Sequence, residues 1–360
     1  MKIICFTSSL TGGGAQHQIS VLANLLSKRG YDVSVVTYKD YADRYQTSPK
    51  VKRIRISAKG SVLKQFFSIC RSLWRLNADC IISFRSPVNF ICLLSLFLRK
   101  KKNVIVGERN LTIEPSFREK INYNFLYYTA KAIVANSYSQ TDYLVSLNKK
   151  WSKRVSTIIN YTNLEKYNCY PIPKNELKKI GIFSRFSHQK NCLRLAKVIN
   201  ELKNKGYRNF CVQWYGDSGV GDLEYEQLCS YIRKYNIESY FELHPAIDNV
   251  QEELRKFHII CLPSLYEGFS NSISEGICSG RPMLVSNVSD NSLMVKDGIN
   301  GYLFNPTNVG DMVNAFEKML MASYEELETM GKNSRKIAEE LFDEEKFVQS
   351  YINLINDIVK

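Results

Sequence analysis

Short apolar runs alternate with longer helix-like segments along both halves of this 360-residue chain, and this alternation strongly constrains the fold. A repeated strand–helix–strand order predicts a parallel sheet with helices on both faces, because parallel neighbours need a crossover connection. In the first half we predict strands at Lys2–Thr7, Asp32–Thr37, Val51–Ile56, Cys80–Phe84, Val104–Gly107 and Ile133–Ala135. The helix-like segments lie near 15–29, 61–76, 87–99, 116–129 and 138–147.

The alternation breaks once, at Pro171 and Pro173 in polar surroundings, which is typical of a linker. It then resumes with predicted strands at Lys179–Ser184, Phe210–Tyr215, Tyr240–Leu243, His258–Leu262 and Met283–Val285 and ends in helices at 308–322, 324–341 and 344–359. The length also favours two domains. We therefore predict an α/β protein with two Rossmann-like domains facing across a ligand-binding cleft and a helical C-terminal end. The domains are 1–163 and 178–343, with a linker at 164–177 and a C-terminal helix at 344–360, whose packing back on the first domain is left open.

Charge divides unevenly between the halves. Residues 1–170 carry 27 Lys and Arg against 9 Asp and Glu, whereas residues 171–360 carry 22 against 26. This asymmetry predicts an anionic surface as partner of the first half. Nucleic acid is disfavoured, because no nucleic-acid-binding motif accompanies the basic residues.

Two segments of the first half favour an anionic membrane surface. The segment 61–76 is a basic amphipathic helix pattern, and Phe90–Leu98 is an apolar run followed by the four cations of Arg99–Lys102. The nine residues of Phe90–Leu98 are too few to span a bilayer. For the apolar faces alone, core helices of an α/β domain are the favoured alternative. Because Met1 runs directly into a strand and the ten cysteines are scattered, we expect a cytoplasmic protein, peripheral at the inner face of the cytoplasmic membrane.

Two glutamates, Glu267 and Glu275, follow the predicted strand His258–Leu262. Glu267 falls in the loop at the carboxyl end of the strand, and Glu275 falls about one turn inside the next helix. Ligands bind at such strand ends in open α/β sheets, where two carboxylates can hold sugar or ribose hydroxyls. The alternative is that Ser272 and Glu275 form a capping box and that Glu267 lies at an ordinary loop tip.

Cations and glycines follow two other strands. Arg185 and Lys190 come after Lys179–Ser184, where they can hold a diphosphate; the alternative is two solvated loop cations. Gly12, Gly13 and Gly14 join the first strand to the first helix, and glycines let backbone N–H groups approach a phosphate closely. The four histidines and the cysteines lack ligand spacing, so we expect no metal and no cofactor.

The order of these motifs resembles glycosyltransferase family 4, whose members have the two-domain GT-B architecture. The glutamate pair resembles its E-x7-E signature, and Arg185 with Lys190 resembles its basic element. Other similar stretches are the glycine loop, in which Gln16 replaces the usual acid, the segments around Gly216–Gly219 and Pro245–Ala246, and Gly107–Asn110, which is similar to an element of polysaccharide-assembly members. The resemblance covers nearly the whole chain.

The resemblance implies a retaining, metal-independent glycosyltransferase that uses a nucleotide diphosphate sugar, most simply a UDP-sugar. Glu275 would hold the ribose, and Arg185 and Lys190 would stabilise the leaving diphosphate. Glu267 would position the sugar, so the implied catalytic residues are Glu267, Arg185 and Lys190. The other implied donor contacts are Gly13, Gly14, Pro245, Ala246, Phe269, Ser270 and Asn271.

The acceptor is inferred from the basic first domain. A lipid-linked glycan at the membrane would place the protein in assembly of a surface polysaccharide such as capsule or O-antigen. Two alternatives remain at this point: a non-catalytic nucleotide-sugar-binding partner of another transferase, and a nucleotide-sugar epimerase of the same fold. Glu108 and Arg109 either touch a sugar or form an interdomain ion pair.

Overall fold

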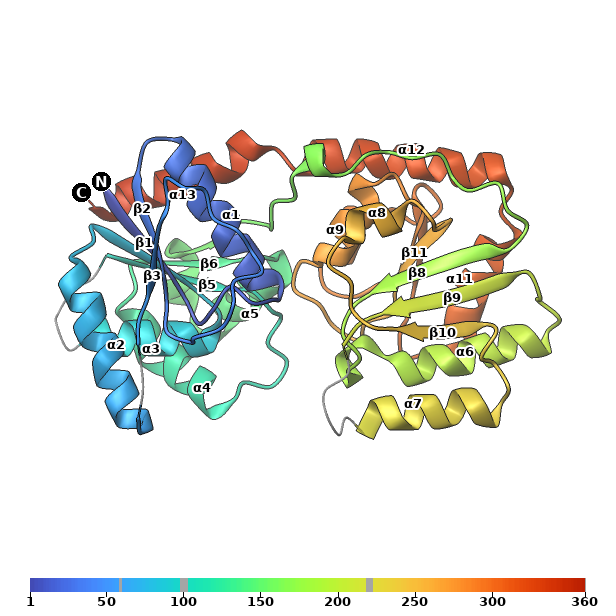
Figure 1. Ribbon diagram of the computed structural model, residues 1–360, viewed down its shortest axis with the longest axis horizontal. Helices are drawn as coiled ribbons and strands as arrows, with labels where there is room; N and C mark the ends of the chain where they lie inside the picture. Colours follow the sequence, from blue (N-terminus) through green and yellow to red (C-terminus); the bar gives the residue numbers. More distant parts are fainter. Residues whose placement is uncertain (58–59, 98–102, 218–222, 360) are drawn as a thin grey trace. The chain divides into compact units, whose positions relative to one another are not determined.

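A computed structural model describes residues 1–57, 60–97, 103–217 and 223–359. The chain forms two compact units: unit 1 is Met1–Tyr161 with Glu344–Lys360, and unit 2 is Thr162–Asp343. Each unit is built on one parallel sheet with helices on both of its faces (Figure 1). The predicted α/β class with two Rossmann-like sheets is confirmed.

Unit 1 contains a seven-stranded sheet in the order β3-β2-β1-β4-β5-β6-β7. The chain moves outward from β1 through β2 to β3, then returns to β4 on the other side of β1. The point between β1 and β4 is therefore the topological switch point of the sheet. The strands are β1 (Lys2–Thr7), β2 (Asp32–Thr37), β3 (Lys52–Arg55), β4 (Cys80–Phe84), β5 (Val104–Glu108), β6 (Ala132–Ala135) and β7 (Val155–Thr157). The helices are α1 (Gly14–Lys28), α2 (Val62–Leu76), α3 (Ser86–Phe97), α4 (Phe117–Asn124), α5 (Tyr138–Leu147) and α13 (Glu344–Val359).

Unit 2 contains a six-stranded sheet in the order β10-β9-β8-β11-β12-β13, with its switch point between β8 and β11. The strands are β8 (Lys178–Phe183), β9 (Phe210–Tyr215), β10 (Phe241–His244), β11 (Ile259–Leu262), β12 (Met283–Ser286) and β13 (Gly301–Phe304). The helices are α6 (Cys192–Asn204), α7 (Leu223–Lys234), α8 (Val250–Leu254), α9 (Asn271–Cys278), α10 (Asn291–Met294), α11 (Val309–Met321) and α12 (Tyr324–Leu341).

Two strands were not predicted. β7 is three residues long, and only the first of them, Val155, is buried. β13 has only its end residues, Gly301 and Phe304, buried, so its apolar pattern is weak. Both strands lie at a sheet edge, where one neighbour suffices, and short edge strands carry little hydrophobic signal.

Helix α2 is only partly a core helix. Ile69, Cys70 and Leu73 are buried, and the indole Nε1 of Trp74 donates to the Ser95 oxygen of α3 at 2.9 Å. The amino-terminal turns instead expose their apolar side chains, which are Val62 (81%), Leu63 (70%) and Phe67 (61%). The favoured expectation of core packing is therefore right for the carboxyl-terminal half of α2 and wrong for its beginning. The predicted cation cluster Arg99–Lys102 lies outside the described residues, and within the described ranges no helix is long and apolar enough to cross a membrane.

Helix α13 is part of unit 1, although the whole of unit 2 separates it in sequence from β7. The buried Tyr351 packs its ring 6.3 Å from that of Phe84, and Phe347 stacks on Tyr161 at 5.5 Å. At the surface, Lys28 Nζ lies 3.1 Å from a Glu344 carboxylate oxygen. These contacts attach the last helix to β4, to the end of unit 1 and to α1.

Gly216 follows β9 at a point where no side chain fits. Its N–H donates to the His244 oxygen at 3.0 Å, and a Cβ added there would lie 2.0 Å from the Ser184 oxygen. We expect Gly216→Ala to lower the free energy of unfolding by about 1–3 kcal/mol, because backbone atoms must move. Urea unfolding should show this as a lower midpoint. The control Gly310→Ala, whose Cβ would meet its nearest atom at 3.4 Å, should unfold at the wild-type midpoint or above. A wild-type midpoint for Gly216→Ala would contradict the close packing.

Candidate functional site

The candidate site lies at the carboxyl edge of the unit 2 sheet, at its switch point. Arg185 lies two residues after the end of β8, and Lys190 closes a short 3₁₀ turn, His188–Lys190, before α6. Glu267 lies in the loop after β11, and Glu275 lies on α9. Since β8 and β11 are hydrogen-bonded neighbours, both loops leave the sheet side by side. The structure therefore brings the predicted basic and acidic residues of unit 2 to one edge.

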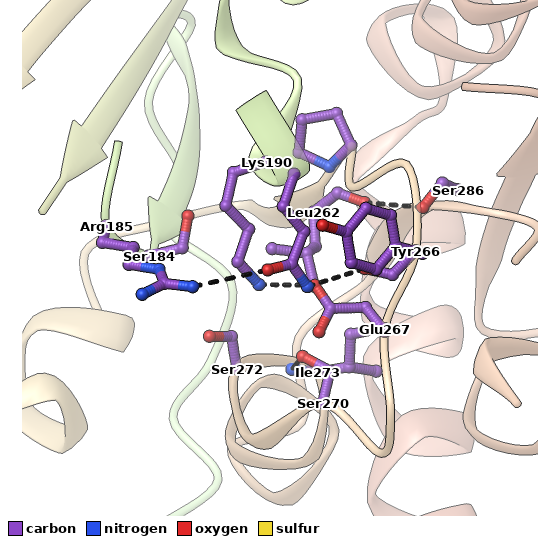
Figure 2. A network of polar contacts seen from close by, with 12 residues as sticks. Ser184, Arg185, Lys190, Leu262, Tyr266, Glu267, Ser270, Ser272, Ile273 and Ser286 are labelled. Atoms are coloured by element: carbon purple, nitrogen blue, oxygen red, sulfur yellow. Dashed lines mark hydrogen bonds and ion pairs between the residues drawn. The ribbon is translucent and has the colours of Figure 1, made fainter. Parts of the chain in front are cut away.

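Lys190 and Glu267 form an ion pair in the centre of this site (Figure 2). Their side chains are only 13% and 9% exposed, so both charges are largely removed from water. An ion pair in such surroundings is stable only when both partners are present, because either charge alone would lack compensation. The predicted alternative of two solvated loop cations is therefore wrong for Lys190.

Two hydrogen bonds through Gln189 join the two loops, and a third ties Glu267 to Ser289 after β12. The Gln189 amide nitrogen donates to the Tyr266 oxygen at 2.9 Å, and the Leu265 N–H donates to the Gln189 oxygen at 2.8 Å. The Glu267 N–H donates to Ser289 Oγ at 3.2 Å. These contacts fix the position of Glu267, which sequence alone placed only as a loop residue.

Asn191 links the loop after β8 to the loops after β11 and β13. It adopts a left-handed conformation with φ of 61° and is buried. Its amide nitrogen donates to the Pro263 oxygen at 3.1 Å and to the Pro306 oxygen at 2.8 Å. Asparagine tolerates this backbone conformation better than most residues, so the turn that presents Lys190 depends on it. Asn191 is not among the predicted site residues.

Arg185 is the cation of the site that remains available. Its side chain is exposed, and Nη2 lies 3.5 Å from the Gln189 amide oxygen (Figure 2). Among the described residues it has no ion-pair partner. A guanidinium held at a strand end without an acidic partner can bind an incoming anion with two parallel hydrogen bonds.

Glu275 does not cap its helix. The N-cap residue of α9 is Ser270, whose side chain accepts from the Ile273 N–H at 3.4 Å, and Ser272 Oγ instead donates to the Phe183 oxygen at 2.6 Å. The capping-box alternative for Ser272 and Glu275 is therefore wrong. The contact between Ser272 and Phe183 joins α9 directly to the end of β8.

The Glu275 carboxyl accepts a hydrogen bond from the hydroxyl of Tyr167, a buried residue at the start of unit 2. Burial raises the pKa of Glu275 to about 7, and the Tyr167 hydrogen bond opposes that rise. Arg335 on α12 holds the same region, since its Nη1 donates to the Tyr167 and Cys278 oxygens at 2.9 and 2.8 Å. No sequence signal marked Tyr167, which lies in the segment predicted as a linker.

The remaining predicted contacts of unit 2 differ in accessibility. Pro245 and Ala246 are exposed just after β10, at the same sheet edge as β8 but two strands away. Phe269 is buried, with its ring 6.2 Å from that of Phe342, and Ser270 uses its hydroxyl as the helix cap. Asn271 is half-buried at the first position of α9. For 269–271 the groups that can reach a ligand are therefore chiefly the N–H groups at the helix start.

The predicted residues of unit 1 form separate arrangements. Gly13 and Gly14 are exposed at the start of α1, and Gly13 has a φ of 97°. Gln16 is buried, and its Oε1 lies 3.0 Å from the position that a Cβ on Gly13 would occupy. The Gln16 side chain therefore packs against the glycine loop.

Glu108 and Arg109 are both buried in unit 1, at the end of β5. Tyr127 donates its hydroxyl hydrogen bond to Glu108, whose pKa is raised to about 7 by burial. Arg109 donates to Asn160 Oδ1 at 3.2 Å and to the Tyr351 hydroxyl, and it stacks on the Phe84 ring at 3.6 Å. All of these partners belong to unit 1, and the buried Nε of Arg109 has no hydrogen-bond partner among the described residues. In the described part of the chain no group of three His, Cys, Asp or Glu side chains is arranged to hold a metal ion.

Two protein-family models match this chain. Residues 12–166 match the family model described as Glycosyltransferase Family 4, and residues 171–337 match Glycosyl transferases group 1. The two matches account for most of both units.

Similar proteins carry glycosyltransferase names. An uncharacterized glycosyltransferase of Haemophilus influenzae is 24% identical over 98% of this chain and 99% of its own length. The Campylobacter jejuni N-acetylgalactosamine-N,N'-diacetylbacillosaminyl-diphospho-undecaprenol 4-alpha-N-acetylgalactosaminyltransferase is 22% identical over 98% and 99%. Among solved structures, Anabaena HepE in complex with UDP and glucose covers 99% of this chain and 100% of its own with a TM-score of 0.82 at 16% identity, which shows the shared fold.

The raised pKa of Glu275 predicts a dependence of stability on pH. In the folded state the carboxyl keeps its proton up to about pH 7, whereas an unfolded glutamic acid loses it near pH 4.5. Folding is therefore favoured below pH 4.5, and this contribution is lost as the pH rises through 7. We expect Glu275→Gln to reduce the fall in unfolding free energy between pH 5 and 8 by up to about 3 kcal/mol. The exposed-residue variant Glu238→Gln should keep the wild-type pH profile in urea titrations, and an unchanged profile for Glu275→Gln would contradict the burial of this carboxyl.

Proposed function

Because the chain belongs to the glycosyltransferases described by these two family models, we propose that it is a retaining, metal-independent enzyme that transfers a sugar from a UDP-sugar. The acceptor is a lipid-linked glycan of surface-polysaccharide assembly, reached at the inner face of the cytoplasmic membrane. One observation carries the donor half of the proposal: the Lys190–Glu267 ion pair at the switch-point edge of unit 2, where Arg185 follows β8 and Glu275 lies on the helix after β11.

The chemistry of the donor fits this site. A nucleotide diphosphate sugar carries a ribose, a diphosphate and a sugar, and the site offers a half-buried carboxyl on α9, an unpaired guanidinium and the Lys190–Glu267 pair. Ribose hydroxyls would bind Glu275, and the diphosphate would bind Arg185 and Lys190. The Anabaena structure supports the choice of UDP, because that protein is in complex with UDP and glucose.

The ion pair suggests how donor binding prepares the site. A donor phosphate competes with Glu267 for Lys190, because both are anions that need the same ammonium group. Once Lys190 turns to the phosphate, the Glu267 carboxylate is free to accept hydrogen bonds from the sugar. Without a donor, Lys190 and Glu267 neutralise each other. When the donor binds, its phosphate takes the place of Glu267 beside Lys190.

In the transfer step the bond between the anomeric carbon and the diphosphate oxygen breaks as the acceptor oxygen bonds to the same face of the sugar. The acceptor proton passes to the departing phosphate oxygen. Arg185 and Lys190 stabilise the negative charge that grows on the diphosphate, a contribution of several kcal/mol in preorganised sites. No metal ion is required where two cationic side chains provide this stabilisation.

The acceptor half of the proposal has two supports. The Campylobacter relative is named for transfer to a diphospho-undecaprenol-linked glycan. Unit 1 carries most of the excess positive charge and exposes Val62, Leu63 and Phe67 at the start of α2. Apolar side chains beside cations are the composition expected of a surface that binds an anionic bilayer.

Arg185→Ala tests the donor half. We expect kcat for sugar transfer, or for slow hydrolysis of the UDP-sugar, to fall by about 10²–10³-fold, because one stabiliser of the leaving group is lost. The circular dichroism spectrum and melting temperature should stay at wild-type values, since Arg185 is exposed. The matched control Lys234→Ala removes an exposed cation on α7 and should keep full turnover. Wild-type turnover by Arg185→Ala would contradict the phosphate role, and binding of donor without any hydrolysis by the wild type would favour a non-catalytic binding protein.

The double variant Leu63→Glu with Phe67→Glu tests the membrane half. We expect cosedimentation with anionic liposomes at moderate salt to fall by about tenfold or more, because apolar contact is replaced by repulsion. Met321→Glu, which changes a 67% exposed side chain in unit 2, is the control and should bind like the wild type. Equal binding by all three proteins, or no binding by the wild type, would contradict a membrane surface on α2.

A further inference from the structure

The carboxyl edge of the unit 1 sheet holds a second group of cations that the proposed donor site does not use. Its centre is the switch point at β1, where Ser8 follows β1, Tyr38 follows β2 and Arg85 follows β4. The Tyr38 and Lys39 N–H groups donate to the Ser8 oxygen at 3.3 and 2.9 Å, which holds these two strand ends together. Ligands of open α/β sheets bind at this place.

Arg85 has a backbone conformation that its side chain does not favour. Its φ is 82°, in the left-handed region where glycine is the preferred residue. The turn itself is well formed, because the Arg85 N–H donates to the Gly107 oxygen at 2.9 Å and the Arg85 oxygen accepts from the Asn89 N–H at 2.9 Å. A glycine would build this turn with less strain. A non-glycine residue in this conformation is a reason to look for a function of its side chain.

Arg118 on α4 lies next to Arg85. The Asn122 amide nitrogen donates to the oxygen and to the Oγ of Ser86 at 3.0 and 2.9 Å, and Ser86 is the residue after Arg85. Arg118 precedes Asn122 by four residues and so shares its face of the helix. Both guanidiniums also lie close enough to Tyr38 to oppose the rise in the pKa of its hydroxyl that burial causes.

Neither arginine is neutralised. Among the residues that the structure describes, the Arg85 and Arg118 side chains have no hydrogen-bond or ion-pair partner. Two other arginines of unit 1 do have partners: Arg53 Nε lies 2.8 Å from the Asp43 carboxylate, and Arg109 donates to Asn160. Two guanidiniums whose charges act on the half-buried Tyr38, one of them on a strained backbone, provide positive charge and several donors at this edge.

We propose that Arg85 and Arg118, with the Tyr38 hydroxyl, bind a phosphate or diphosphate group of the acceptor. The exposed start of α1 at Gly13 and Gly14 follows β1 at the same edge and adds backbone N–H groups. This inference rests on the proposed function, since it assigns the acceptor an anionic group. It is separate from the donor phosphates, which Arg185 and Lys190 bind in unit 2.

The test uses titration calorimetry of the full chain with inorganic pyrophosphate and with geranyl diphosphate, at saturating UDP so that the donor site is filled. We expect the wild type to bind both probes and Arg85→Gly and Arg118→Ala each to bind about tenfold or more weakly, because each loses a charge-assisted hydrogen bond. The control Lys131→Ala removes an exposed cation of unit 1 and should bind like the wild type. Tighter binding of geranyl diphosphate than of pyrophosphate identifies a lipid-linked diphosphate as the source, and equal binding identifies recognition of the phosphate groups alone.

Arg85→Gly also separates a binding role from a structural one. Because glycine suits a φ of 82°, this variant should melt at the wild-type temperature or above while it loses the probe. Wild-type affinity in both Arg85→Gly and Arg118→Ala, or no binding of either probe by the wild type, would overturn the inference. Slow hydrolysis of the UDP-sugar in these variants reports on the donor site alone. In the wild type, hydrolysis of the UDP-sugar without binding of either probe would reject only this inference, and absence of hydrolysis would reject the proposed function.

Discussion

The arrangement of the proposed donor site depends on one interaction, the ion pair between Lys190 and Glu267. Each side chain is nearly enclosed, so neither charge would be stable there without the other. The contacts of Gln189, Asn191 and Ser289 hold the two loops in the positions that the pair requires. A ligand that binds Lys190 must therefore supply a negative charge of its own, which is the property of a sugar nucleotide's diphosphate.

Both sheets have a topological switch point with charged groups at the carboxyl edge, but the charges of these groups differ. Unit 2 presents cations and carboxylates together, as suits a ligand with both phosphates and hydroxyls. Unit 1 presents Arg85 and Arg118, which have no acidic ion-pair partner among the described residues, as suits an anion. The same architecture can thus serve donor and acceptor chemistry because the residues after the strands differ while the strands themselves are alike.

Much of the fold could be predicted from sequence because buried parallel strands are short, continuous apolar runs. The two strands that escaped prediction, β7 and β13, are edge strands with weak runs. The site was predictable where function needs a charged residue just after a strand, as for Arg185 and Glu267. Long-range partners were not: nothing local indicates that Tyr167 reaches Glu275 or that Ser272 bonds to Phe183 rather than capping its helix. Likewise the strained backbone conformation of Arg85 could not be predicted from its residue type.

The central claim is that the carboxyl edge of unit 2 binds and activates a nucleotide diphosphate sugar. The most direct measurement is a panel of UDP- and GDP-sugars incubated with the purified protein, with melting temperature and released nucleotide followed together. We expect one UDP-sugar to raise the melting temperature and to be hydrolysed slowly with release of UDP. This result would also identify the transferred sugar. A well-folded protein whose melting temperature no nucleotide sugar changes, and which releases no nucleotide from any of them, would contradict it.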